Sequence, residues 1–167
     1  MEHYKIIAGF ETYSVSDHGN VKNNKTARIM KTRFHPEGYI IVDMRLNKQR
    51  YSKRVHILVA NAFIANPDEK ACVDHIDNIK SNNNINNLRW ATYSENQHNK
   101  SMMSNNTSGV KGVVWDKDRN KWRAQIMIDG MQIYLGLFEN LEDAKRARMI
   151  RANQAFGVFT NSCEKII

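Results

Sequence analysis

The chain has 167 residues, of which 41% are hydrophobic and 25% are charged, and this composition excludes a long disordered tail and suits one or two small folded modules. Lys and Arg outnumber Asp and Glu by 25 to 17, so the net charge of +8 favours a polyanionic partner. No run of apolar residues is long enough for a membrane span or a signal peptide, and we therefore expect a cytoplasmic protein without a membrane partner.

The charge is unevenly distributed along the chain. Residues 1–66 hold 11 basic and 5 acidic side chains, residues 67–99 hold 3 and 5, and residues 100–167 hold 11 and 7. Basic surfaces bind phosphates by displacing counterions, whereas a divalent metal ion needs carboxylate or amide oxygens. This pattern predicts two basic arms that bind DNA and a slightly acidic middle that holds a metal centre.

The two cysteines, Cys72 and Cys163, are far apart and form no C-x-x-C pair. Neither a structural zinc site nor a disulfide framework is therefore expected.

Residues 1–54 are predicted to form a small β-rich, DNA-contacting module. Turn signals lie at 17–20, 22–25 and 35–38, with short β-prone stretches between them. Residues 39–46 alternate as in a half-buried strand, and residues 51–55 can pair back with them across a basic turn at 47–50.

Residues 55–100 are predicted to form a central module of helix, strand, loop, strand and helix. Apolar residues recur at helical spacing in 56–63, and short strands at 71–73 and 88–91 flank an Asn-rich loop. Thr92 and Glu95 form a capping box, so a helix that carries Asn96 begins there.

Residues 101–107 are polar and unperiodic, and we expect them to be a linker. Beyond them, strands are predicted at 110–115, 121–128 and 132–138, with a hairpin signal at Asp129-Gly130. Asn140 can cap a helix from Leu141 to about Phe156, and Gly157 can end it. The expected fold class is α+β, and its C-terminal domain, residues 108–161, is a three-stranded antiparallel sheet packed on one helix.

One order of residues in the middle resembles the motif of the HNH endonucleases, in the subfamily of phage and intron-encoded homing endonucleases. It runs Val73-Asp74-His75, then Asn86-Asn87-Leu88-Arg89-Trp90, then Glu95-Asn96, and Val55 to Ala60 is similar to the V-H-R-L-V-A helix that precedes it. The resemblance covers about residues 50–100 and implies the ββα-metal fold. Asn78 and Ile79 replace the frequent Gly-Asn, and Asn tolerates positive φ only in part.

The resemblance also implies roles for single residues. His75 would be the general base, Asp74 and Asn96 would supply oxygens to one divalent cation, Mg²⁺ or Mn²⁺, and Asn87 would hold the loop between the two strands. His98 or Asn99 could take the place of Asn96. His56 could either support the fold or line the active site.

The C-terminal residues 107–161 resemble the APETALA-type domain of plant ethylene-response factors, whose sheet lies in the DNA major groove. The likeness rests on Ser108 to Trp115, Lys121 to Ile126, Ile133 to Phe138 and Glu142 to Ala144. Arg123, Gln125 and Met127 share one face of the second strand. The DNA contacts expected here are Lys111, Trp115, Lys121, Arg123, Gln125 and Tyr134. Core positions for Trp115, Trp122 and Tyr134 are the alternative.

Residues 7–21 resemble the short module that precedes HNH domains in these phage enzymes. Among the basic residues outside the C-terminal domain, Lys31, Arg33 and Arg89 are predicted to contact DNA, whereas a merely solvated face is the alternative for the segment from Lys22 to Arg33.

The sequence thus predicts a site-selective endonuclease of duplex DNA, encoded by a phage and acting in its bacterial host. One centre per chain favours nicking unless the protein dimerises, and a monomer or a homodimer is possible. Two other functions remain open, a DNA-binding regulator with an inactive centre and an RNA-binding module.

Overall fold

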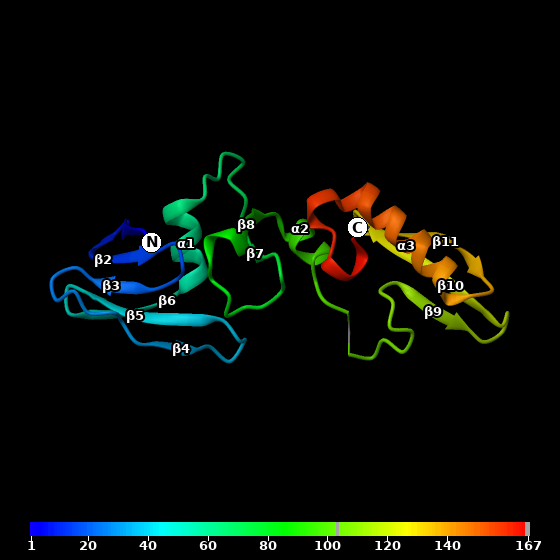
Figure 1. Ribbon diagram of the computed structural model, residues 1–167, viewed down its shortest axis with the longest axis horizontal. Coiled ribbons are helices and arrows are strands. Elements are labelled where there is room, and N and C mark those ends of the chain that lie inside the picture. Colours follow the sequence, from blue (N-terminus) through cyan, green and yellow to red (C-terminus); the bar gives the residue numbers. More distant parts are fainter. Residues whose placement is uncertain (103, 166–167) are drawn as a thin grey trace. The chain divides into compact units, whose positions relative to one another are not determined.

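The computed structural model describes residues 1–102 and 104–165 (Figure 1). It divides into two compact units, Met1–Tyr93 and Ser94–Ile167. Small antiparallel sheets and few helices make up both units, which confirms the expected α+β class. Within the described ranges, no helix has the length and apolar character needed to cross a membrane.

The first unit begins with two three-stranded antiparallel sheets. Their strands are β1 (Tyr4–Ile7), β2 (Phe10–Ser16) and β3 (Val21–Asn23), and then β4 (Thr32–Phe34), β5 (Ile40–Leu46) and β6 (Gln49–Arg54). β5 and β6 pair across Asn47 and Lys48, whose φ values of 49° and 67° fit the primed turns that tight hairpins prefer.

The rest of the first unit is α1 (Val55–Phe63), β7 (Cys72–His75), the short 3₁₀ helix η1 (Ile85–Asn87) and β8 (Leu88–Ala91), with β7 and β8 paired as a two-stranded sheet. A single hydrophobic core joins α1 to both N-terminal sheets, through residues such as Val15, Val42, Val55 and Val59. Helix α1 therefore buries its apolar face against residues of the predicted N-terminal module.

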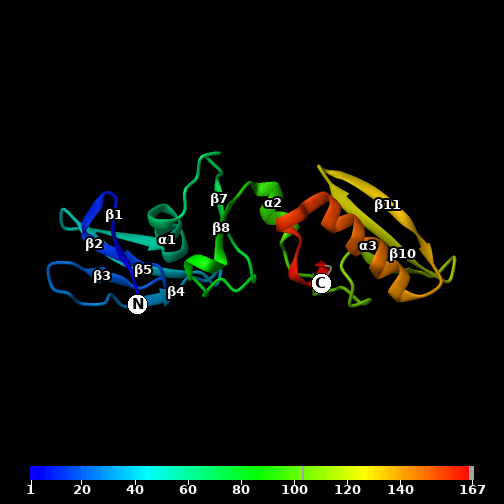
Figure 2. The same cartoon turned by 45° about the horizontal axis from the view of Figure 1, so that its top comes forward.

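The second unit contains α2 (Tyr93–His98), which starts at the division, a three-stranded antiparallel sheet and the long helix α3 (Leu141–Phe156). The sheet consists of β9 (Val113–Asp116), β10 (Lys121–Ile128) and β11 (Met131–Phe138), and η2 (Gly157–Phe159) and η3 (Ser162–Glu164) follow α3. Asn140 caps α3 by accepting a hydrogen bond from the backbone N–H of Asp143, as expected. Figure 2 shows α3 lying along one face of this sheet.

The division between the units falls after Tyr93, the first residue of α2, and the linker predicted at 101–107 lies beyond it. Helix α2 is held inside the second unit, since the ring of His98 stacks on Phe156 at 3.8 Å and Asn161 donates a hydrogen bond to the carbonyl of Asn99. Lys111 donates to the carbonyl of His98 at 2.8 Å. Polar composition alone did not reveal these contacts.

Candidate active site

Asp74 and His75 are the last two residues of β7, and both are buried, with exposed fractions of 4% and 5%. Antiparallel pairing places Asp74 opposite Arg89 of β8. The Arg89 guanidinium binds one carboxylate oxygen of Asp74 through Nε at 2.8 Å and Nη2 at 2.7 Å. Arg89, which was predicted to contact DNA, has a mostly buried side chain that pairs with Asp74.

The imidazole of His75 is held by a hydrogen bond and by ring packing. Its Nε2 lies 3.2 Å from Oδ1 of Asn83, and its ring centroid lies 4.9 Å from that of His56. In the neutral tautomer that donates from Nε2 to the Asn83 carbonyl, Nδ1 carries the lone pair that can accept a proton. Burial is the main cause that lowers the pKa of His75, which favours the neutral form of the ring.

His56 lies in the first turn of α1, and its ring packs against the rings of Tyr39 and His75. The ring centroid is 4.8 Å from that of Tyr39, and only 3% of the residue is exposed. Burial, followed by the charges of His75 and Arg54, lowers the pKa of His56 to about 3. Its Nδ1 has no hydrogen-bond partner among the described residues. His56 thus supports the fold and at the same time forms a wall against His75.

The loop between β7 and β8 is closed by Asp77 and Asn87. Asn87 donates from Nδ2 to the Asp77 carboxylate at 2.8 Å and accepts the Asp77 backbone N–H at 3.1 Å. Asn78, one of the two departures from the family pattern, adopts a φ of +62°. The loop therefore keeps a left-handed residue at this position without glycine, and Asn87 ties its two ends together.

An N-terminal turn supports the same loop. The carbonyl of Asp17 accepts the backbone N–H of Ile85 at 2.8 Å. A Cβ placed on Gly19 would lie 2.8 Å from the Cβ of Asn83, the residue that holds His75. The sequence showed this turn but not its target, because the two segments are more than sixty residues apart.

Asn96 lies on α2 in the second unit and is half-buried. The alternatives to Asn96 are both engaged in packing there, since His98 stacks on Phe156 and Asn99 is 1% exposed. Of these three side chains on or next to α2, Asn96 is the one that neither stacks on a ring nor is fully buried.

Known proteins match this chain over both halves of the first unit. Residues 53–98 match the HNH endonuclease family and residues 2–45 match the NUMOD4 motif. The uncharacterized HNH endonuclease L245 of Acanthamoeba polyphaga mimivirus is 32% identical over 108 residues, which are 65% of this chain and 33% of L245. Protein 3.8 of Escherichia phage T7 is 36% identical over 91 residues, which are 53% of this chain and 75% of that protein. The chain belongs to the HNH endonuclease family.

A solved structure is similar to this HNH family member over a larger part of the chain. The HNH homing endonuclease I-HmuI, from Bacillus phage SP01, superimposes with a TM-score of 0.56 at 28% identity, over 79% of this chain and 76% of the other. That structure describes DNA binding and cleavage by I-HmuI. The present chain spans only a third of the mimivirus relative.

The donors of this HNH chain suit a hard cation. No group of three or more His, Cys, Asp or Glu that could hold a metal ion occurs among the described residues. Asp74 and Asn96 offer one carboxylate and one amide oxygen, and Mg²⁺ is commonly bound through one or two carboxylates together with water and substrate phosphates. The oxygen donors therefore fit Mg²⁺ or Mn²⁺.

The predicted DNA contacts of the C-terminal sheet differ in exposure. Arg123, Tyr134 and Trp115 are exposed, and Trp115 also packs edge-on against Trp122 with ring centroids 5.0 Å apart. Lys121 lies 3.6 Å from Glu139, and Gln125 is half-buried and accepts a hydrogen bond from Gln132.

Lys111 does not fit the predicted contact with DNA. Its ammonium donates to the carbonyls of His98 and Lys100 and lies 3.5 Å from the buried carboxylate of Glu164. No local pattern of residues indicates these contacts of Lys111, because its partners are distant along the chain.

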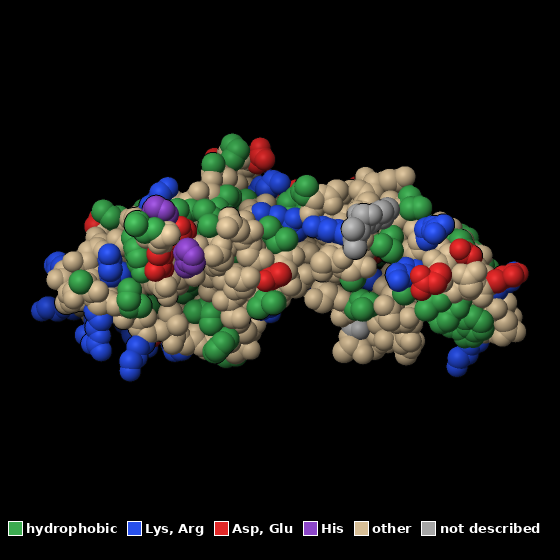
Figure 3. Space-filling view, viewed as in Figure 1, with side chains coloured by type: hydrophobic (Ala, Val, Ile, Leu, Met, Phe, Trp, Pro, Cys, Tyr) green, Lys and Arg blue, Asp and Glu red, His purple; other side chains and the backbone are tan. Residues whose placement is uncertain are grey.

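Basic side chains of the first unit project around β3 to β5 (Figure 3). The exposed ones in the segment proposed to bind phosphates are Lys25, Arg28, Lys31 and Arg33. Arg33 keeps about half of its side chain exposed while its Nε lies 3.2 Å from Asp43.

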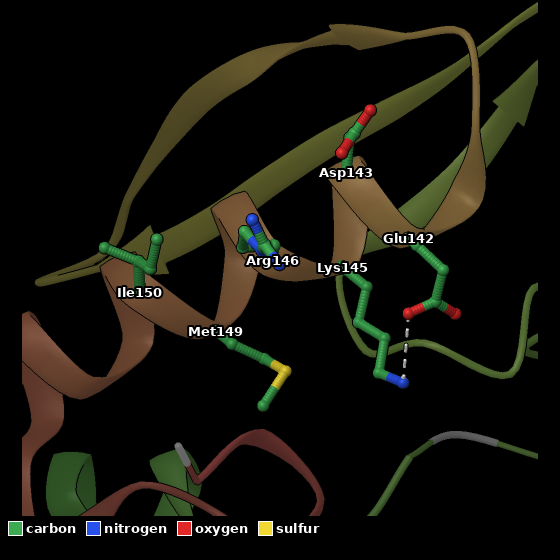
Figure 4. Close-up of a pocket in the computed structure, with 6 residues that line it drawn as sticks. All are labelled: Glu142, Asp143, Lys145, Arg146, Met149 and Ile150. Carbon is green, nitrogen blue, oxygen red and sulfur yellow. Dashed lines mark ion pairs between the residues drawn. The ribbon is translucent and has the colours of Figure 1, made fainter. Parts of the chain in front are cut away.

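A hollow on the outer side of α3 contains none of the predicted catalytic or DNA-binding residues (Figure 4). Its lining includes Met149, Ile150 and the ion pair of Lys145 with Glu142, whose atoms are 3.6 Å apart.

Proposed function

We propose that this chain is a site-selective endonuclease that hydrolyses phosphodiester bonds in duplex DNA, as a phage homing endonuclease does. The observation that carries the proposal is His75, a buried imidazole that Asn83 orients and that follows Asp74 in β7, within the residues that match the HNH family. A neutral histidine at the end of a rigid strand is suited to general-base catalysis.

In the proposed reaction, Nδ1 of His75 takes a proton from a water molecule. The water oxygen forms a bond to phosphorus, and the bond between phosphorus and the leaving oxygen of the DNA strand breaks. Asn83 keeps the ring in the tautomer whose lone pair is on Nδ1. Asn87 holds the loop that supports Asn83.

Asp74 and Asn96 would hold one divalent ion, Mg²⁺ or Mn²⁺. When bound, the ion offsets the negative charge that develops on the phosphate. The pairing of Arg89 with Asp74 fixes this carboxylate in place, which suits a metal ligand.

The exposed Arg123, Trp115 and Tyr134 of the second unit support a role for its sheet in DNA binding, in the manner of the APETALA-type domains. The exposed Lys31 and Arg33 support a second contact with phosphates. Both contacts would add to the DNA surface that the nuclease module covers, and this would make cleavage site-selective.

A supercoiled plasmid tests this function. We expect relaxed circles in Mg²⁺ or Mn²⁺ and none with a chelator, because a single centre per chain cuts one strand at a time. Tight DNA binding without any cleavage in either metal would contradict the proposal and favour a DNA-binding regulator.

A further inference from the structure

Tyr39 connects the two buried histidines to a pair of surface cations. Its ring centroid is 6.2 Å from that of His75 and 4.8 Å from that of His56. The guanidinium carbon of Arg54 lies 4.7 Å, and Nζ of Lys80 lies 4.8 Å, from the centroid of the same ring. Two positive charges are thus gathered over one aromatic ring that packs beside the proposed general base.

These cations come from different segments but share one anchor. Arg54 ends β6 and binds the Glu37 carboxylate at 2.6 Å, while Lys80, from the loop between β7 and β8, donates to the Glu37 carbonyl at 2.8 Å. Side chains restrained in this way lose less conformational entropy when they bind a ligand than free lysines or arginines lose.

The cluster of Arg54, Lys80 and Glu37 has a net positive charge. Glu37 supplies one carboxylate for the two cations, and it is itself 56% exposed, so water screens it. Arg54 is 40% exposed and Lys80 is exposed. A guanidinium has five N–H donors and an ammonium has three, so both groups retain donors that can reach an anion from solution.

The cations also act on the histidines electrostatically. Burial is the main cause of the lowered pKa of both rings, and the charges of Arg54 on His56 and of Lys80 on His75 lower these pKa values further. Both cations contact the Tyr39 ring that packs beside His75, so a substrate that reaches His75 also passes the pair.

Resting on the proposed function, we infer that Arg54 and Lys80, positioned over Tyr39, bind backbone phosphates of the DNA strand next to the bond that is cut. Phosphates follow one another about every 3.4 Å along the axis of a DNA strand, so a strand that reaches His75 presents further phosphates to the cation pair. The two residues thereby position the scissile phosphate, without taking part in proton transfer.

Binding measured without cleavage tests the inference. In a His75→Ala background, we would determine the Kd for duplex DNA at several salt concentrations, with and without Arg54→Gln or Lys80→Gln. Each substitution should weaken binding and reduce the slope of log K against log salt by about 0.9, the value for one lost phosphate contact. Lys53→Gln is the matched control, because Lys53 is also an exposed cation over an aromatic ring, 5.7 Å from the centroid of Phe10.

A second measurement locates the phosphate that Lys80 contacts along the cut strand. Single neutral methylphosphonate linkages in the cut strand should weaken binding near the cleavage site, and Lys80→Gln should abolish this sensitivity at one of them while Lys80→Arg restores it. Salt slopes that stay unchanged, or that fall equally for Lys53→Gln, would overturn the inference. Because binding is measured apart from cutting, a wild-type protein that binds in this way but never cleaves would contradict the proposed nuclease and leave the phosphate contacts in place.

Discussion

His75 owes its expected reactivity to its neighbours. The carbonyl of Asn83 fixes which ring nitrogen carries the proton, and the rings of His56 and Tyr39 exclude water from one side. A base held by packing and by one directed hydrogen bond needs little reorganisation when it reacts. The consequence is that residues which never touch DNA should still control the rate.

Asn83→Ala should lower the rate of cleavage at saturating DNA by up to about 10²-fold with little change in KM, since it removes the orientation of His75 and no substrate contact. Steady-state nicking of a labelled duplex measures both constants. Asn86→Ala, an exposed asparagine in the same loop, is the control and should behave as the wild type. Equal kcat values for the Asn83 and Asn86 variants would refute the role of Asn83.

Asp43 should make the stability of the first unit depend on acidity. Hydrogen bonds from Arg50, Ser52 and Arg33 hold the pKa of this carboxyl well below its ordinary value of 3.8. Because the pKa of the folded state is depressed, the stabilisation is complete above the ordinary value and is lost as the pH falls below it.

We therefore expect Asp43→Asn to lower the melting temperature at pH 7, and the difference between the two proteins to shrink as the pH falls below 3.8, because the unfolded wild-type chain then takes up a proton that the folded Asp43 carboxyl resists. Thermal unfolding followed by circular dichroism over this pH range measures the difference. A difference that stays constant from pH 7 to pH 2 would show that the charge of Asp43 is not its cause.

The elements themselves were largely predictable, whereas the contacts between them were not. Local signals such as the Asn140 cap and the Asp129-Gly130 turn depend only on neighbouring residues, and the structure confirms both. Asn83 and Tyr39 carry no local signal, because their importance arises from contacts with His75 and His56 across the fold. The contact of Lys111 with the buried Glu164 carries no local signal either, since counting charges does not reveal a buried partner.

The turn between β2 and β3 gives a test of such a long-range contact. Gly19 has a φ of +87°, and an added Cβ would lie 2.8 Å from that of Asn83. Gly19→Ala should therefore destabilise the first unit by about 1–3 kcal/mol or more and also slow cleavage by displacing the partner of His75.

Gly9→Ala is the matched control for this substitution. Gly9 has a φ of +76°, but an added Cβ would have no atom within 4 Å. Gly9→Ala should strain the backbone but leave cleavage unchanged. Chemical unfolding measures the strain, and nicking at a temperature where both variants are folded measures cleavage. Equal cleavage by the two variants would argue against the coupling of this turn to the active site.

Asp74 and His75 belong to the first unit, and Asn96 belongs to the second. Helix α2 is held in the second unit by a buried polar cluster. Glu164 is 2% exposed, and its carboxylate lies 2.9 Å from Arg148 and 3.5 Å from Lys111. The fold of the second unit should therefore depend on this buried cluster.

Glu164→Gln should destabilise the second unit by about 3–5 kcal/mol, because it leaves two cations buried without their counter-charge. Hydrogen exchange resolved by segment should show lost protection in α2 and α3 while β5 and β7 keep theirs. Glu142→Gln, in an exposed ion pair of α3, should change protection little. Unchanged protection in α2 for Glu164→Gln would show that the cluster does not hold this helix.

The most direct test of the proposed nuclease is single-turnover nicking of a duplex in Mg²⁺ or Mn²⁺ by the wild type and by His75→Ala, with the Kd for DNA measured for both. We predict that the wild type cuts one strand, and that His75→Ala binds with the same Kd but cuts at least about 10²-fold more slowly, the rate that a general base contributes. Cutting by His75→Ala at the wild-type rate would contradict the assignment of His75 as the base on which this mechanism depends.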